Sequence, residues 1–392
     1  MIFAGDSTAM AKMKEITVFA DGDSSKLTTW SNVPYLFTET LRSKGIKVNR
    51  VDIHQNFKIK NWWDRTMGRV LLHFVNEDTS YTYFRSLPHF LDVRGRIRKA
   101  MKARPNSDAN VFLTFSFSSA GMTQKPTVLF CDWTYDHWLK NHAGREPDPF
   151  EKRSVRREDR QIEQADLVIC LYPGVTRLMR QKYRNPNIYY LGNVVNAVCE
   201  PDEQSKMLER KRHSARLVFV GAVKYRVGAR ALCSALEILR NEFPDMNLDL
   251  IGMTDQEIGP VPAGVRCHGH LDKDQPEQRA LFYNILGEAK VFINTTPKWA
   301  AFSAAVEAMY FYTPVVISPY SEFVEMFGNE INFGEYCNDN SPVAIASGIR
   351  KILQRPDYDQ LCVNAHDAVR DYRWDTYIDR VLAKIEEVSP ID

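Results

Sequence analysis

The stretch that decides the fold is VFINTTPKWAAFSAAVEAMYFYTPVVIS, residues 291–318. It opens with a short apolar run of strand type at 291–294 and continues through a polar and aromatic loop at 295–301. A helix that is apolar or small on nearly every face follows at 302–312, and a second strand at 313–317. This order predicts one unit of a parallel α/β sheet.

The helix in this stretch carries one acid, Glu307, and no charged stripe that would bring the acid to solvent. A buried carboxylate needs a partner, because an unpaired buried charge is strongly unfavourable. One alternative is a structural ion pair with an Arg or a Lys. The other is a set of ligand hydroxyls at the helix N-terminus, where free N–H groups also attract phosphate. The second alternative describes a nucleoside diphosphate site.

The motif FSxxxEAM at 302–309, followed by TPVV at 313–316, resembles the donor signature of the retaining glycosyltransferases of family 4. The resemblance implies a GT-B fold, in which two doubly wound Rossmann-like α/β domains face a cleft. It also implies that Glu307 binds the ribose of a nucleotide sugar. The family has a first glutamate eight positions earlier, where this chain has Trp299, or Ala300 if one loop residue is deleted. The donor-binding residues implied are Glu307, Ser303, Ala304, Ala305, Phe302, Gly221, Gly269, His270 and Thr296.

Length and composition limit the classes of protein that this chain can represent. A length of 392 residues suits two domains, and 51 basic against 49 acidic residues give a net charge of +2, so we expect no nucleic-acid partner. The longest apolar runs are far below the ~18 residues of a spanning helix, and no signal peptide is evident, which predicts a cytoplasmic protein. The seven scattered cysteines are expected to be reduced core residues.

The first domain is expected to begin after a leader or cloning remnant at 1–14. A strand at 15–20, a helix at 32–44 and a strand at 46–53 are typical of a doubly wound domain. The loop between the first strand and the helix has one glycine, which argues against a dinucleotide dehydrogenase. Its WSNVP segment at 30–34 resembles a WSGxP form of family 4, and this implies acceptor-side roles for Asp23, Trp30, Ser31 and Asn32. An ordinary turn with Asn32 as helix cap is the alternative.

Two basic segments of the first domain leave alternatives open. The helix at 94–104 could dock on an anionic membrane, but a solvated basic face fits its pattern better. The helix at 151–164 has Arg153, Arg156, Arg157 and Arg160, which could bind an anionic acceptor. Acids at 151, 158, 159 and 163 alternate with them and favour a salt-bridged surface helix.

Asp132 follows the expected strand at 127–131, at the edge where α/β sheets bind their ligands. The resemblance implies that it faces the transferred sugar as a catalytic residue, because family 4 has a His or an Asp there. The alternative is a helix cap.

The second domain restarts the alternation of strands and helices after a polar linker at 192–214, with strands at 216–220, 247–251 and 265–268. Where the family has Gly-Arg and then Lys on the donor diphosphate, this chain has Gly221-Ala222. Lys224 and Arg226 are therefore the cations expected to act in catalysis. We expect no cofactor and no metal, because the one Asp-x-Asp segment, at 21–23, lies in the wrong domain and His268 and His270 lack a third ligand.

These features predict an acceptor-side domain at 15–205, joined by a terminal helix at 374–392, and a nucleotide-sugar domain at 206–373. The predicted activity is transfer of a sugar, with retention, from a nucleotide-diphosphate donor to a hydroxyl of a glycan or lipid-linked acceptor. Two alternatives stay open. One is a catalytically silent donor-binding or scaffold subunit, and the other is a nucleotide-sugar epimerase of the same fold.

Overall fold

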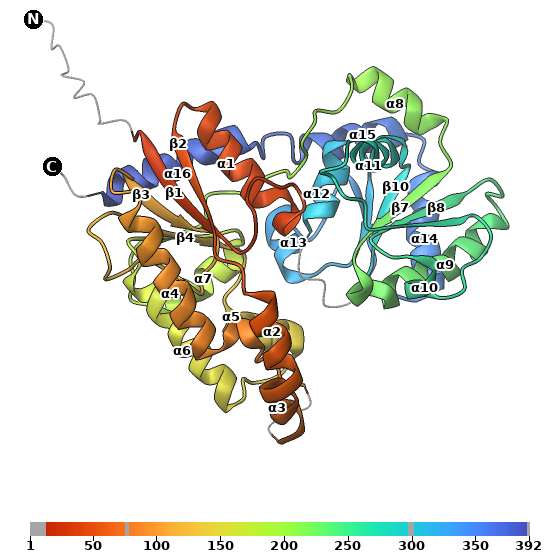
Figure 1. Ribbon diagram of the computed structural model, residues 1–392. Coiled ribbons are helices and arrows are strands. Elements are labelled where there is room, and N and C mark those ends of the chain that lie inside the picture. Colours follow the sequence, from red (N-terminus) through yellow and green to blue (C-terminus); the bar gives the residue numbers. More distant parts are fainter. Residues whose placement is uncertain (1–12, 75–77, 297–301, 390–392) are drawn as a thin grey trace, which may run out of the picture.

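The computed structural model describes residues 13–74, 78–296 and 302–389. Two six-stranded sheets, in which every strand pair is parallel, are each packed between helices and form two domains side by side (Figure 1). The predicted fold class, two doubly wound α/β domains, is confirmed. Apolar strands buried on both faces explain why the strand segments lack a clean alternation of polar and apolar residues.

The first sheet has the order β2-β1-β3-β4-β5-β6. Its strands are β1 (Glu15–Ala20), β2 (Lys47–Asp52), β3 (Ala109–Phe112), β4 (Thr127–Cys131), β5 (Leu167–Cys170) and β6 (Ile188–Tyr189). Its helices are α1 (Val33–Ser43), α2 (Phe57–Trp63), α3 (Arg69–Phe74), α4 (Leu87–Lys102), α5 (Tyr135–Trp138), α6 (Pro149–Gln164) and α7 (Pro173–Lys182). The last helix of the chain, α16 (Trp374–Val388), returns to this domain and packs on α1, with Tyr377 and Ile378 in its core.

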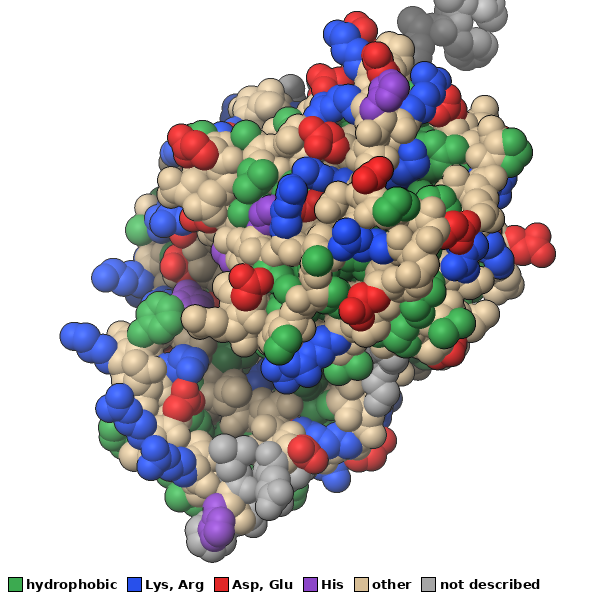
Figure 2. All heavy atoms as spheres, turned by 90° about the vertical axis from the view of Figure 1, so that its right-hand side faces the viewer, with side chains coloured by type: hydrophobic (Ala, Val, Ile, Leu, Met, Phe, Trp, Pro, Cys, Tyr) green, Lys and Arg blue, Asp and Glu red, His purple; other side chains and the backbone are tan. Residues whose placement is uncertain are grey.

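The second sheet has the order β12-β11-β10-β7-β8-β9. Its strands are β7 (Arg216–Val220), β8 (Asn247–Ile251), β9 (Val265–Gly269), β10 (Val291–Asn294), β11 (Val315–Ile317) and β12 (Gly334–Tyr336). Its helices are α8 (Gln204–Arg212), α9 (Arg226–Arg240), α10 (Asp255–Ile258), α11 (Pro276–Glu288), α12 (Ser303–Tyr310), α13 (Ser321–Phe327), α14 (Pro342–Leu353) and α15 (Tyr358–Asp367). Acidic and basic side chains are intermixed on the face of the molecule that Figure 2 shows.

The expectation of an irregular linker over the whole of 192–214 is wrong, because α8 lies within it. The many charged residues of this segment make its apolar face hard to recognise in the sequence. In the structure Met207, Leu208 and Lys211 are buried. The Lys211 ammonium donates to the carbonyls of Leu286 and Ala289 and to the Thr313 hydroxyl, so the buried polar group is hydrogen-bonded.

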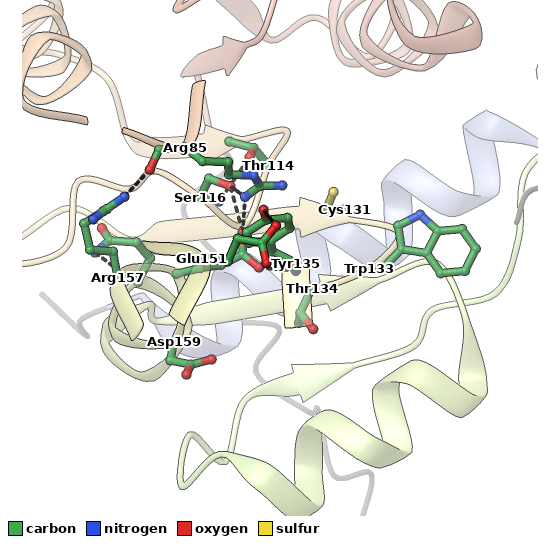
Figure 3. Close-up of polar contacts among 12 residues, drawn as sticks. Arg85, Thr114, Ser116, Cys131, Trp133, Thr134, Tyr135, Glu151, Arg157 and Asp159 are labelled. Atoms are coloured by element: carbon green, nitrogen blue, oxygen red, sulfur yellow. Dashed lines mark hydrogen bonds and ion pairs between the residues drawn. The ribbon is translucent and has the colours of Figure 1, made fainter. Parts of the chain in front are cut away.

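The expectation that 151–164 is a salt-bridged surface helix is also wrong for two of its acids, because Glu151 and Glu158 are buried. Their partners come from outside the helix. Arg145 donates to both Glu151 oxygens at 2.7 Å, and Arg85 and Ser116 donate to Glu158 at 3.0 and 2.7 Å. Figure 3 shows Arg85, Ser116 and Glu151 of this cluster beside the end of β4, with Trp133 pointing away from them. The buried acids therefore tie α6 to the segments around the β4 end.

In each sheet the order of the strands reverses at one point, the topological switch point. In the second sheet this switch lies between β7 and β10, and in the first it lies between β1 and β3. Open α/β sheets bind ligands in the crevice beyond the carboxyl ends of the strands at such a point. The loops that follow β1 and β7 are therefore the places where a ligand is expected.

Candidate functional site

A cavity of about 390 Å³ lies between the domains and is lined by the loops that follow β1 and β7. Eight predicted site residues line it: Gly221, Lys224, His270, Ser303, Ala304 and Glu307 from the second domain, and Ser31 and Asn32 from the first. The structure thus brings together, from four separate segments, half of the residues that the sequence singled out. The size suits a small-molecule ligand.

Glu307 lies on α12 with its side chain 6% exposed, and its carboxylate is already paired. The Lys273 ammonium donates to its two oxygens at 2.8 and 3.1 Å, and the Tyr283 hydroxyl donates to one of them at 2.9 Å. Lys273 also lies 3.8 Å from the centre of the Phe282 ring. This is the structural ion pair that the sequence left open as an alternative. Glu307 and Lys273 both line the cavity, so a ligand in it can compete for either of them.

The loop after β7 forms the opposite part of the second-domain wall. Lys224 lines the cavity from a short 3-10 turn, Val223–Tyr225, and its ammonium lies 4.8 Å from the centre of the Tyr225 ring. Gly252 has a φ of +101°, and a Cβ atom there would lie 2.5 Å from the carbonyl oxygen of Gly221. The close approach of these two loops therefore depends on glycine at position 252. Arg226 lies outside the lining and donates to the Glu257 carbonyl at 3.2 Å.

The start of α12 places Ser303 and Ala304 at the cavity, whereas Phe302 and Ala305 are buried beside it. Phe302 packs on Tyr172 of the first domain with ring centres 5.4 Å apart.

Thr296 lies beneath Gly228, and its buried hydroxyl has no hydrogen-bond partner among the described residues. Gly269 ends β9 just before His270. Trp299 and Ala300, the positions of the absent first glutamate, lie outside the described residues.

The first-domain loop that lines the cavity has an unusual backbone. Trp30, Ser31 and Asn32 have φ angles of 38°, 52° and 70°, a left-handed conformation that non-glycine residues adopt at a cost. The interpretation of Asn32 as a helix cap is wrong, because its amide donates instead to the Asn196 carbonyl at 2.7 Å. Trp30 packs edge-on against Phe130. The Asp23 carboxylate accepts hydrogen bonds from the amide and the hydroxyl of Ser25 within its own turn. These hydrogen bonds lower the pKa of Asp23.

Asp132 follows β4 but does not line the cavity. One of its carboxylate oxygens accepts from the Trp133 amide at 2.9 Å and the Cys131 thiol at 3.2 Å, and burial raises its pKa. The helix-cap alternative is wrong, because Thr134 caps α5 by accepting from the His137 amide. His137 in turn lies 3.8 Å from Glu322 of the second domain, so this region also faces across the cleft.

Sequence reasoning missed Lys273 and Tyr283, the two partners of Glu307, and Asp274, which contacts the first domain. Lys273 and Asp274 lie in the polar loop LDKDQ, where nothing in the pattern separates a site residue from a solvated one. Among the residues that the structure describes, no three His, Cys, Asp or Glu side chains cluster as a metal site would require. Likewise, within the described ranges, no helix is both long and apolar enough to cross a membrane.

The cleft and the two switch points define a protein of the GT-B class, and comparisons with known proteins agree. Structures with this arrangement include sucrose-phosphate synthase from Thermosynechococcus elongatus (TM-score 0.62, 16% identity, covering 94% of this chain and 97% of that one). HepE of Anabaena, in complex with UDP and glucose, gives a TM-score of 0.60 at 13% identity, covering 94% and 98%. A structure from Listeria monocytogenes that is described as a UDP-N-acetylglucosamine 2-epimerase gives a TM-score of 0.57 at 15% identity, covering 96% of each chain.

The family model for glycosyl transferases group 1 matches residues 201–368, so the second domain is recognised as a domain of that family. No curated protein sequence matches the chain significantly. The resemblance to group 1 glycosyltransferases with the GT-B fold is thus confirmed.

Proposed function

We propose that this chain is a retaining glycosyltransferase that moves a sugar from a nucleotide-diphosphate donor to a hydroxyl of a glycan or lipid-linked acceptor. The observation that carries the proposal is the cavity at the facing switch points, with Glu307 and Lys224 on its second-domain wall. A carboxylate suits the hydroxyls of a ribose, and an ammonium suits a diphosphate. We place the reaction in the cytoplasm, in polysaccharide or glycolipid assembly.

In the proposed reaction the bond between the anomeric carbon and the donor phosphate breaks, and a bond from that carbon to the acceptor oxygen forms on the same face. The leaving phosphate takes the acceptor proton. Lys224 and the N–H groups at the start of α12 offset the charge that develops on the diphosphate, so the proposal needs no metal. Asp132, which lies outside the cavity lining, is proposed to face the sugar from the end of β4.

The epimerase alternative fits the cavity less well. Such chemistry needs acids and bases at the sugar carbon. The described lining has one carboxylate, Glu307, which is paired, and one histidine, His270. A catalytically silent subunit would bind the nucleotide with neither transfer nor hydrolysis of the donor, and this outcome separates it from the transferase.

The test is a thermal-shift and calorimetry screen with UDP, GDP, ADP, CMP and dTDP, each with and without EDTA. We expect one nucleotide to stabilise the protein by mass action and EDTA to leave the shift unchanged. Glu307→Gln should weaken binding by about 1–3 kcal/mol, the scale of a hydrogen bond to a charged group. Glu330→Gln, at an exposed position of the same domain, is the matched control. Equal affinity in both variants would refute the ribose assignment.

We also propose that the first domain rests on an anionic membrane while it acts on a lipid-linked acceptor. Phe57 and Trp62 on α2 and Leu91 on α4 are 65%, 60% and 58% exposed. Arg96 joins the two helices by donating to the carbonyls of Ile53 and His54, just before α2. Exposed aromatic and aliphatic side chains beside a basic helix are typical of surfaces that bind anionic lipid.

A further inference from the structure

Residues 271–275, in the loop between β9 and α11, contact both walls of the cavity through two consecutive side chains. Lys273 pairs with Glu307 on the second-domain wall. Asp274 crosses to the first domain, where one carboxylate oxygen accepts from the Leu27 amide at 2.9 Å and the other from the Thr28 hydroxyl at 3.3 Å. Leu27, Thr28 and Lys273 all line the cavity. One short loop therefore joins the candidate donor site to the loop that covers it.

The 271–275 loop is braced so that its two contacts depend on each other. The Asp274 amide donates to Asp272 at 2.8 Å, and the Asp272 amide donates to Gln278 at 2.8 Å. Arg279 donates to the Lys273 carbonyl at 2.9 Å. These short bonds tie the backbone on both sides of Lys273 into one unit, which the Lys273–Glu307 pair anchors at one cavity wall and Asp274 anchors at the other. Loss of one anchor therefore weakens the hold of the other.

The covering loop of the first domain is held in an unfavourable conformation. Trp30, Ser31 and Asn32 are consecutive left-handed residues, each without the freedom of glycine. The contacts that hold this loop include the Asn32 bond to Asn196 and the two bonds to Asp274. A strained segment opens more readily when one of the bonds that hold it is lost.

We propose that occupancy of the donor site is relayed by the 271–275 loop to the covering loop at 27–32, with Asp274 as a positioning residue. This proposal rests on the proposed function, because it takes ligand hydroxyls to bind Glu307. A carboxylate has about four acceptor positions, and Lys273 and Tyr283 occupy three of them, so a ribose diol displaces one of these donors; in the relay this donor is Lys273. Lys273 then moves toward the donor diphosphate, Asp274 loses its hold on Leu27, and the covering loop is released.

Hydrogen exchange of the full chain, followed by mass spectrometry on peptides that cover residues 24–32, tests the relay. Without ligand, Asp274→Ala should exchange about tenfold faster in this segment, because Leu27 loses a charge-assisted hydrogen bond. Lys273→Met should also accelerate it, although the substituted side chain does not touch the first domain. Lys206→Met, on the exposed face of α8, should change nothing. The double variant Lys273→Met/Glu307→Gln covers the case in which an unpaired Glu307 destabilises the single variant.

In the wild type, a saturating concentration of UDP should accelerate exchange at residues 24–32, and this response should be absent in Lys273→Met. The relay is overturned if Lys273→Met and its double variant exchange like the wild type at these residues, or if bound UDP slows or does not change them. Calorimetry on the same samples keeps the two proposals apart. If UDP does not bind, the donor assignment is at fault for this nucleotide, whereas the ligand-free variants still decide the relay.

Discussion

Glu307 illustrates how one residue gains its meaning from distant partners. Its two partners, Lys273 and Tyr283, lie 34 and 24 positions away along the chain. The sequence predicted that an acid on an apolar helix must be paired, because burial of a lone charge is strongly unfavourable. It could not name the partner, since helix α11, strand β10 and their loops lie between Lys273 and Glu307 along the chain. The structure shows the ion pair, and the binding of ligand hydroxyls by the same carboxylate stays a prediction.

Asp132 is the residue whose predicted role most needs a kinetic test. We expect Asp132→Asn to lower kcat by about a hundredfold, as loss of one preorganised charge at a reacting centre does. Nucleotide affinity, measured by calorimetry, should change little. A loss confined to nucleotide binding would contradict a position near the sugar.

Because His89 is buried, we expect the folded protein to lose stability in acid. It is fully buried among the rings of Tyr83, Phe84 and Phe117, and neither ring nitrogen has a hydrogen-bond partner among the described residues. Burial, with nearby Arg96, lowers its pKa to about 4 from the ordinary histidine value of 6.5. The unfolded state then binds more protons between these values, so stability is present above pH 6.5 and falls as the pH drops toward 4.

Replacement of His89 by Leu should remove this dependence. We expect the fall in unfolding free energy between pH 6.5 and 4 to shrink by about 1–3 kcal/mol, measured by urea denaturation at both pH values. His213→Leu, at an exposed position, is the control. An unchanged pH profile in His89→Leu would assign the acid sensitivity to other groups.

At the scale of elements, α6 shows how a charged pattern can mislead. Alternating acids and arginines predicted a solvated helix, yet Glu151 accepts from Arg145 and from the Ser80 and Asp148 amides. Burial opposes ionisation of Glu151, but these hydrogen bonds outweigh it and lower its pKa to about 2. The pattern of charges gives the helix period and not the environment of each face, because neighbouring segments supply the partners.

Arg145→Met should destabilise the protein by about 3–5 kcal/mol, because it leaves a buried carboxylate without its cation. Adding Glu151→Gln should recover part of the loss, since a neutral amide needs no counter-charge. Thermal and urea denaturation measure both variants. Arg156→Met, at an exposed position of α6, should stay within about 0.5 kcal/mol of the wild type. Equal effects of the two arginine substitutions would show that the buried pair does not stabilise α6.

At the scale of the whole molecule, two sheets with facing switch points leave the first domain free to present α2 and α4 outward (Figure 1). Residues 57–74 carry Lys58, Lys60, Arg65 and Arg69 against one acid, Asp64. The apolar side chains of this region are thus surrounded by positive charge, whereas the chain as a whole is nearly neutral.

We expect the protein to sediment with vesicles of phosphatidylglycerol and phosphatidylcholine, and to be released as salt rises, because screening weakens attraction to anionic lipid. Phe57→Ser/Trp62→Ser should reduce the bound fraction severalfold, since these rings would enter the interface. Val343→Ser, at an equally exposed apolar site on the second domain, is the matched control. Binding that is the same in all three proteins, or absent with anionic vesicles, would exclude this surface as the docking face.

The sequence by itself predicted the two-domain α/β architecture, because strand and helix periods are local properties, and its resemblance to family 4 pointed to the site residues. Half of the predicted site residues line one cavity, and the loops of parallel strands account for this. Only the tertiary structure decided which side chains meet there. The pairing of Lys273 with Glu307 and of Asp274 with Leu27 joins segments 34 and 247 positions apart, and such contacts depend on packing that no local pattern encodes.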